Sequence, residues 1–314
     1  MAEKIIVIAG PTASGKTRLS IELAKMYNGE IVSADSMQVY RRMDIGTAKA
    51  TPDERAQAPH HMLDVAEPDE NYSVARYVEE ASRCCDDIIA RGKLPIVTGG
   101  TGLYIDSLLS GRDFAESRTD SAVRESLERE YDALGPEAMH ARLAGIDPER
   151  AAKLGVGDRR RVLRALEVWM LTGQTITEHD RLSRLVPERY DCAYIVLNYA
   201  ERSKLYERID LRVDMMLKEG LEDEVRSLLA SGLSPDCTAM QAIGYKEMAE
   251  YVAGKLSLSE ASELIKQSSR RYAKRQLTWF RRREGALWIN WGDDCDMEKA
   301  RQLSSEFLRL HGIS

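Results

Sequence analysis

The chain has 314 residues, of which 43% are hydrophobic and 31% charged, with a formal net charge of −6. This composition is ordinary for a globular protein, and the length accommodates one large α/β domain with a smaller one. No apolar run reaches the roughly 20 residues of a transmembrane helix, and Met1 leads almost directly into a strand-like segment, which predicts neither a membrane anchor nor a signal peptide. The five cysteines are odd in number and lack paired metal-site spacing, which favours a reduced cytoplasmic protein.

The segment GPTASGKT, residues 10–17, has the two glycines, lysine and closing hydroxyl of a phosphate loop. It lies between an apolar run typical of a buried strand, residues 4–9, and a segment with helical spacing, residues 17–27. In such a loop the backbone N–H groups surround a di- or triphosphate and the lysine neutralises its oxygens, while Thr17, or Ser14 nearby, can offer a hydroxyl to Mg²⁺. The loop alone does not distinguish kinases, switch GTPases, motor ATPases and group transferases.

Two further strand-like runs are each followed by polar residues, which we expect at the same edge of the sheet as the phosphate loop. Residues 30–34 lead into Asp35, and residues 94–97 lead into a glycine-rich turn that ends at Thr101. Ligands of open α/β sheets bind at the carboxyl ends of the strands. Asp35 is therefore a candidate for holding or deprotonating an acceptor, and the alternative is that it caps a turn. Thr101 has the same two interpretations, a site hydroxyl or a helix cap.

The order of these elements predicts an α/β fold with a phosphate-loop, parallel-sheet core. Strand signals disappear from residue 112 to 190, where charged helical segments predict an inserted helical domain. A strand at 191–197 returns the chain to the core, which is thus formed by residues 1–111 and 191–314. The C-terminal part is mainly helical, with one last strand. The expected helices span 74–89, 121–134, 136–143, 159–171, 176–185, 201–219, 221–231, 259–283 and 296–310, with a further segment near 243–248, and the last strand spans 286–290.

Basic residues gather in two places on this acidic chain. Eight lie between Lys266 and Arg283, with no acidic residue among them, and a second cluster surrounds Arg159-Arg160-Arg161. Basic side chains interleaved with aromatic rings suit RNA, although a core face backed by a basic solvent face is the alternative. Arg208 and Arg212 lie four residues apart and could bind one anion, but the residues alone favour a salt-bridged surface with the neighbouring Asp210 and Asp214.

Six segments in order resemble the bacterial tRNA dimethylallyltransferase family over nearly the whole chain: GPTASGKT, DSMQVY at 35–40, MDIGTAK at 43–49, GGTGLY at 99–104, RALE at 164–167 and KRQLTWFR at 274–281. The resemblance implies transfer of a dimethylallyl group from dimethylallyl diphosphate to the N6 amine of adenosine 37, 3′ of the tRNA anticodon, with release of diphosphate. It also implies Mg²⁺ as cofactor and the tRNA anticodon stem-loop as partner. Composition and spacing give no sign of a prenyl donor. A monomer without membrane association is expected.

The resemblance assigns roles to particular residues. Asp35 would take the proton of the amine, Thr101 would hold the bridging oxygen of the donor, and Lys16 with Arg212, in preference to Arg208, would bind the departing diphosphate. Magnesium would lie near Thr17. The implied donor-binding residues are Gly10, Pro11, Thr12, Ala13, Ser14, Gly15, Lys16 and Thr17. The implied tRNA-binding residues are Asp35, Ser36, Met37, Gln38, Thr101, Arg124, Arg160, Arg161, Val162, Leu163, Arg164, Ala242, Ile243, Gly244, Tyr245, Lys246, Glu247, Lys274, Arg275, Gln276, Leu277, Thr278, Trp279, Phe280 and Arg281.

Three other functions share part of this pattern. An adenylate isopentenyltransferase would share the loop and the aspartate but would need neither the basic helix nor the insertion. An ATP-dependent small-molecule kinase would share the loop alone. An RNA-binding NTPase switch would share the loop and the basic surface, but the chain lacks the guanine-reading Asn-Lys-x-Asp motif of switch GTPases.

Overall fold

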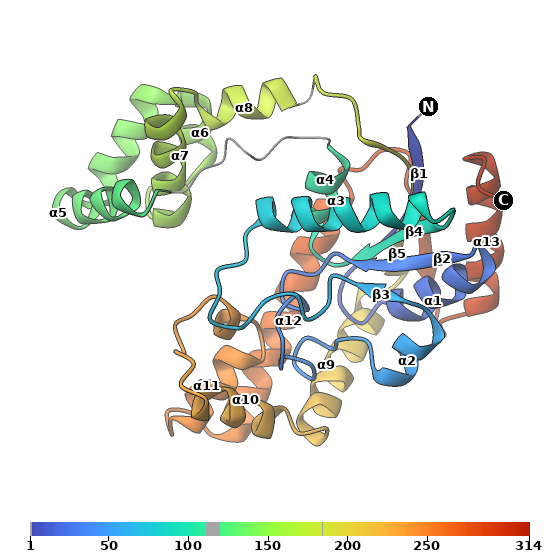
Figure 1. Ribbon diagram of the computed structural model, residues 1–314. Coiled ribbons are helices and arrows are strands. Elements are labelled where there is room, and N and C mark those ends of the chain that lie inside the picture. Colours follow the sequence, from blue (N-terminus) through green and yellow to red (C-terminus); the bar gives the residue numbers. More distant parts are fainter. Residues whose placement is uncertain (1, 111–119, 184) are drawn as a thin grey trace. The chain divides into compact units, whose positions relative to one another are not determined.

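The structure is a computed structural model that describes residues 2–110, 120–183 and 185–314. The chain divides into two compact units (Figure 1), a larger one of residues 1–109 and 189–314 and a smaller one of residues 110–188. Within the described ranges, no helix has both the length and the apolar character needed to cross a bilayer.

The larger unit is built on a six-stranded sheet in the order β3-β2-β4-β1-β5-β6, in which every pair is parallel. The strand β1 lies between β4 and β5, and Ile6 is in register with Ile96 on one side and Ala193 on the other. Parallel strands read as apolar runs because helices cover both faces. The strands span Glu3–Ala9 (β1), Gly29–Ser33 (β2), His60–His61 (β3), Leu94–Gly99 (β4), Tyr190–Tyr199 (β5) and Leu287–Trp291 (β6).

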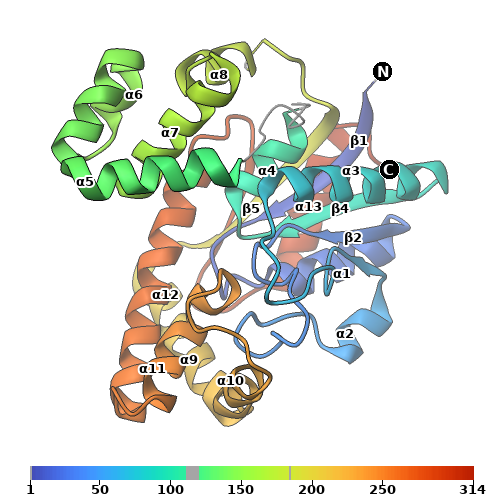
Figure 2. The same ribbon diagram turned by 60° about the vertical axis from the view of Figure 1, so that its left-hand side comes forward.

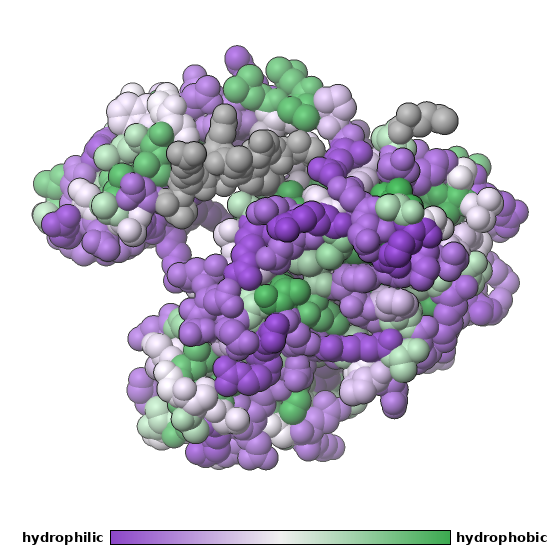
Figure 3. Space-filling view, in the orientation of Figure 1, coloured by the Kyte–Doolittle hydropathy of each residue, from purple (hydrophilic) through white to green (hydrophobic). Residues whose placement is uncertain are grey.

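Alternate residues of β1 enter two separate cores. Ile5 and Val7 belong to one core, which α3 (Val74–Ala90) and α4 (Gly102–Leu109) cover. Ile6 and Ile8 belong to the other, which α1 (Lys16–Met26) and α13 (Met297–Leu310) cover. This division follows from the two-residue period of a strand. In Figure 3 the visible face of the larger unit is mostly hydrophilic, with apolar residues only in small separate groups.

Four C-terminal helices complete the larger unit: α9 (Arg202–Lys218), α10 (Leu221–Ala230), α11 (Tyr245–Val252) and α12 (Leu258–Phe280). The long helix α12 packs against both α9 and α11 (Figure 2). Its capping box, in which Ser257 and Glu260 each bond the other's backbone N–H, fixes the start of the helix.

The smaller unit has a hydrophobic core of its own, centred on Leu127, Leu143 and Leu166. It contains α5 (Ser121–Ile146), α6 (Pro148–Lys153), α7 (Arg159–Thr172) and α8 (Ile176–Ser183). Gly135, with φ 83°, interrupts α5 just before Pro136, as the two expected segments 121–134 and 136–143 had indicated.

The predicted α/β class with a parallel phosphate-loop sheet is confirmed. The sequence did not predict the two-residue edge strand β3, nor the short helices α2 (Pro52–Gln57) and α6. A six-residue helix spans too few turns for a period to show, and here the proline at the first turn and the cap residues Thr51 and Asp147 are what begin these helices.

A buried carboxylate at the amino end of β2 gives a stability prediction. Glu30 is 2% exposed and accepts hydrogen bonds from Arg91 and Lys93, with His61 2.7 Å away. The bond from Arg91 holds the pKa of Glu30 well below its usual range, so the stabilisation is complete above the unfolded-state pKa and is lost as pH falls. Glu30→Gln is expected to lower the free energy of unfolding at neutral pH by about 2 kcal/mol in urea titrations, with a difference that shrinks below about pH 4.3.

The matched control for this prediction is Asp87→Asn. Asp87 is exposed and pairs with the same Arg91, so its loss is expected to change the free energy of unfolding by less than about 0.5 kcal/mol. Equal effects of the two substitutions would contradict the prediction.

Candidate active site

A cavity of about 490 Å³ opens at the carboxyl edge of the sheet in the larger unit. Its lining includes segments that are far apart in the sequence: the phosphate loop, the turn that follows β2, the loop of residues 46–48, the end of β4, residues 241–243, and the facing sides of α9 and α12. Lys16, Asp35 and Arg212, which come from three of these segments, are all lining residues.

The phosphate loop, residues 10–15, joins β1 to α1. Gly10 packs so closely that a Cβ there would lie 2.5 Å from the carbonyl oxygen of Leu197 on β5. Ala13 and Gly15 have φ values of 63° and 85°, which turn the chain sharply before the first turn of α1. The amide groups of residues 13–17 therefore cluster at the amino end of a helix, an arrangement that attracts anions.

Two cations converge in the cavity. Burial and the nearby Arg212 guanidinium lower the pKa of Lys16 to about 7, although the Asp35 carboxylate opposes this shift. Burial likewise lowers the pKa of Arg212, again opposed by Asp35. The Lys16 Nζ donates to the carbonyl oxygen of Pro11 at 2.7 Å. Lys16 and Arg212 lie near enough to affect each other's charge, and together they favour the binding of a multiply charged anion.

Asp35 and Thr101 lie at the same edge of the sheet. Asp35 Oδ1 accepts from the backbone N–H groups of Met37 and Gln38, at 2.9 and 3.4 Å, so it does cap a turn, as the alternative interpretation held. This role fixes the orientation of the carboxylate without using Oδ2. The Thr101 hydroxyl accepts from the N–H of Ser36 at 3.0 Å, which ties it to the Asp35 turn.

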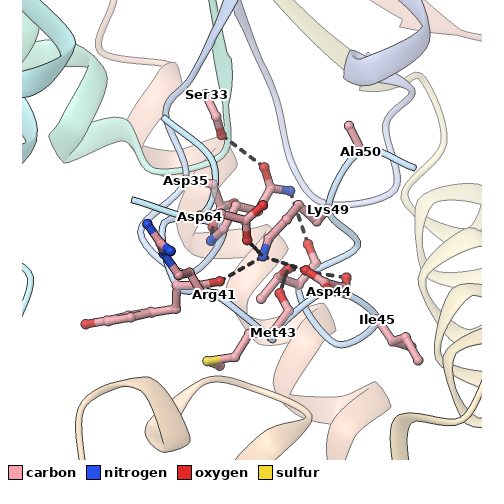
Figure 4. Close-up of polar contacts among 12 residues, drawn as sticks. Ser33, Asp35, Arg41, Met43, Asp44, Ile45, Lys49, Ala50 and Asp64 are labelled. Carbon is pink, nitrogen blue, oxygen red and sulfur yellow. Dashed lines mark hydrogen bonds and ion pairs between the residues drawn. The ribbon is translucent and has the colours of Figure 1, made fainter. Parts of the chain in front are cut away.

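The loop of residues 43–49 is held by a buried lysine (Figure 4). Lys49 Nζ donates to Asp44 Oδ1, Asp64 Oδ1 and the carbonyl oxygen of Tyr40 at 2.6 to 2.7 Å, and its side chain is 1% exposed. The loop carbonyls of residues 47 and 48 in turn accept from Gln38 Nε2, whose carboxamide oxygen accepts from Ser33. The Gln38 side chain is thereby fixed beside the cavity.

Lys49→Met is expected to lower the free energy of unfolding by about 3 kcal/mol, because it leaves two carboxylates and a carbonyl without their shared cation. Arg55→Gln is the control, since Arg55 pairs with Asp64 at the exposed end of the same network and its loss is expected to cost less than about 1 kcal/mol. Chemical denaturation of both variants measures these changes. An equal loss of unfolding free energy in the two variants would contradict the assigned role of Lys49.

No group of three or more His, Cys, Asp or Glu side chains within the described ranges is arranged to hold a metal ion. Two hydroxyls of the phosphate loop were candidates. Both line the cavity, but Ser14 is fully buried and its Oγ donates to the Pro11 carbonyl, whereas Thr17 at the start of α1 is partly exposed. One hydroxyl ligand beside a phosphate suits Mg²⁺, which keeps several waters and binds substrate oxygens.

One wall of the cavity is apolar and was not predicted from the sequence. Ile209, Val213 and Met216 of α9 and Ile265 of α12 line it. Their helical spacing is also that of ordinary core residues, and both arrangements give the same pattern in a sequence.

Arg212 lines the cavity, whereas Arg208 hydrogen-bonds with the Tyr199 hydroxyl. The salt-bridged surface expected from the residues alone, with Asp210 and Asp214 as partners, is wrong. Asp210 pairs with Arg270 and Asp214 pairs with Lys266, both on α12. The first two cations of the long basic run are thus neutralised within the protein, while Arg271, Lys274, Arg275, Arg281 and Arg282 remain exposed.

The ranges implied for RNA binding also contain buried side chains. Val162, Leu163, Ala242, Tyr245, Leu277 and Phe280 are less than 9% exposed and pack into the cores of their units, and Gln276 is 5% exposed and lines the cavity. The contacts with tRNA that the resemblance implies for these residues stay predictions, and they would have to use the backbone or the little side-chain surface that is accessible. Arg124 and Arg164 both pair with the buried Glu167, which leaves Arg160 and Arg161 as the exposed cations of that cluster.

This arrangement defines a class. A parallel α/β sheet, a phosphate loop, paired cations and a carboxylate at one sheet edge belong to a phosphate-loop enzyme that handles a phosphorylated substrate.

Comparison with known proteins gives the family. A family model described as IPP transferase matches residues 38–283, and one described as isopentenyl transferase matches residues 3–65. The chain is 46% identical to the tRNA dimethylallyltransferase of Acetivibrio thermocellus over 99% of both chains, and 52% identical to that of Exiguobacterium over 92% of this chain and 90% of the relative. The chain belongs to the IPP transferase family and is a transferase.

Solved structures agree with this assignment. The tRNA isopentenylpyrophosphate transferase of Bacillus halodurans is 42% identical, with a TM-score of 0.73 over 99% of this chain and 98% of that one. A eukaryotic dimethylallyltransferase, solved acting on tRNA, is 32% identical, with a TM-score of 0.83 over 98% of this chain and 80% of that one.

Proposed function

We propose that this protein transfers a dimethylallyl group from dimethylallyl diphosphate to the N6 amine of adenosine 37 of tRNA, just 3′ of the anticodon, and releases diphosphate. The observation that carries the proposal is that a phosphate loop, a carboxylate and an apolar wall meet in one cavity. Family membership supports the reaction type, and the cavity supports the roles of individual residues.

The donor's diphosphate would bind the amides of residues 13–17, with Lys16 and Arg212 neutralising its charge. The apolar wall of α9 and α12 suits a short branched hydrocarbon, because burying it removes apolar surface from water. Magnesium bound beside Thr17 would supply further positive charge to the leaving diphosphate. The Thr101 hydroxyl, at the same edge of the sheet, would bond the bridging oxygen of the donor.

The acceptor nitrogen attacks C1 of the dimethylallyl group as the bond from C1 to the diphosphate oxygen breaks, and the oxygen keeps the electron pair. The amine then carries a surplus proton, which Asp35 accepts. Adenine's amine is a weak nucleophile, so positioning and stabilisation of the leaving group provide most of the rate enhancement. An unpaired loop base leaves its stack at a cost of about a few kcal/mol or less.

The exposed cations of α12 and of the smaller unit would bind the RNA backbone. Arg282 lies over the Trp279 ring at 5.3 Å and Arg275 near Tyr272 at 5.5 Å, so cations and rings alternate on this helix. Such surfaces bind phosphates and stack splayed bases. This surface favours tRNA over free AMP, the acceptor of an adenylate isopentenyltransferase.

Label transfer tests the proposal. The protein is incubated with Mg²⁺ and labelled dimethylallyl diphosphate, with either unmodified tRNA or AMP as acceptor, and in parallel with labelled ATP and candidate acceptors. We expect label in tRNA at adenosine 37. Transfer from ATP, or to AMP in preference to tRNA, would overturn the proposal.

A further inference from the structure

The helix α12 has a second role besides presenting cations. While Lys274, Arg275 and Arg281 are exposed, another face of the same turns packs against the active site. Gln276 lies on that face and is 5% exposed. A polar side chain buried this deeply needs hydrogen-bond partners, and their identity indicates what the residue does.

Gln276 joins two separate segments of the site. Its Oε1 accepts from the backbone N–H of Thr12 in the phosphate loop at 3.1 Å, and its Nε2 donates to the carbonyl oxygen of Gly100, after β4, at 2.9 Å. The fit at Gly100 is close, because a Cβ on that residue would lie 2.2 Å from Gln276 Nε2. Glycine at this position therefore gives the carboxamide its space.

The Thr12 amide precedes those of residues 13–17. Gln276 thus holds the beginning of the phosphate loop and leaves the later amides, which converge at the helix terminus, free for a diphosphate. Gly100, the other partner, is next to Thr101. The side chain therefore connects the diphosphate cradle with the segment that carries the Thr101 hydroxyl.

The neighbouring turns of α12 contact the same region. Tyr272, one turn before Gln276, is partly buried; desolvation raises its pKa to about 12, and its hydroxyl interacts with the side chains of Thr101 and Gln276. Trp279, less than one turn after, donates its indole N–H to Asp106 of α4 at 2.7 Å. These contacts fix α12 along the whole glycine-rich segment.

We propose that Gln276 is a positioning residue that holds the phosphate loop and the Gly100 segment in register, and so links the RNA-facing helix to the donor site. This inference rests on the proposed function only for the identity of the donor. It assigns to Gln276 a role in diphosphate binding in place of the direct tRNA contact that the resemblance implied.

Two variants test the inference from opposite sides. Gln276→Met keeps the length of the side chain but removes both hydrogen bonds. Gly100→Ala keeps the glutamine in the sequence, but the added methyl group displaces its carboxamide. We expect each to weaken binding of inorganic diphosphate with Mg²⁺, measured by calorimetry without RNA, by about tenfold. Affinity for an anticodon stem-loop, measured without donor, is expected to stay within about twofold of wild type, because the side chain is buried.

Arg281→Gln provides the contrast on the same helix, since its side chain is exposed. It is expected to weaken stem-loop binding and leave diphosphate binding unchanged. Wild-type diphosphate affinity in both Gln276→Met and Gly100→Ala would overturn the inference, as would a loss of stem-loop affinity alone in Gln276→Met. If Gln276→Met does not fold, the diphosphate affinity of Gly100→Ala decides. A wild-type protein that binds diphosphate but does not prenylate tRNA would refute the proposed function and not this inference.

Discussion

Asp35→Asn is expected to lower the turnover number by about 10²- to 10⁴-fold, the usual contribution of a general base. The reason is chemical, because the carboxamide cannot accept the proton that the N6 amine releases. The structure makes asparagine the informative substitution. Its side-chain oxygen can still accept from the N–H groups of Met37 and Gln38, so the turn stays intact. Single-turnover prenylation of tRNA with saturating donor measures the effect.

Affinity for the anticodon stem-loop is expected to change by less than about twofold in Asp35→Asn. Asp35→Ala provides the comparison, since it removes the base and also the turn's acceptor, and is expected to be at least as slow and less stable. If Asp35→Asn retained near-normal turnover while Asp35→Ala lost it, the carboxylate would be a structural cap and not the base.

Diphosphate binding is expected to depend on the protonation of Lys16. Because the pKa of Lys16 is about 7 in the free protein, much of its side chain is neutral at mildly alkaline pH. A bound diphosphate favours the ammonium form and raises that pKa, so binding takes up a proton. The contribution of Lys16 to affinity is therefore complete below pH 7 and falls by about tenfold for each pH unit above it, until the pKa of the complex is reached.

Lys16→Met isolates the contribution of Lys16 to diphosphate affinity. At about pH 6 the substitution is expected to weaken diphosphate binding by about 10- to 100-fold, the value of a hydrogen bond to a charged group. The difference in diphosphate affinity between wild type and variant then becomes smaller as pH rises. Diphosphate itself titrates in this range, but it does so equally with both proteins. Calorimetry across the range gives the two profiles, and parallel profiles would show that Lys16 does not titrate on binding.

Local sequence patterns predicted the sheet and most helices, because each depends on residues close together in the chain. The phosphate loop is the clearest case, since its strand, glycines and helix are contiguous. The six-residue helices α2 and α6 and the edge strand β3 are too short for a hydrophobic period to show. The kink at Gly135 could be predicted because glycine followed by proline interrupts any helix.

Long-range pairing could not be predicted in the same way. Asp210 and Asp214 seemed available to their own helix, yet their partners Arg270 and Lys266 lie about fifty to sixty residues away in the sequence and meet them only when α9 packs on α12. Gln276 lies within the basic run, so the sequence predicted that it binds RNA like its basic neighbours. Which face of a helix is buried depends on the elements that pack against it, and the sequence of the helix alone does not show this. The apolar wall resembled ordinary core for the same reason.

The most direct test of the account is the structure of the protein with an anticodon stem-loop and an unreactive donor analogue. We predict the analogue's diphosphate on the amides of residues 13–17, and the N6 amine of adenosine 37 within hydrogen-bond distance of Asp35 Oδ2. An adenine bound away from Asp35, or a diphosphate bound outside the phosphate loop, would contradict it.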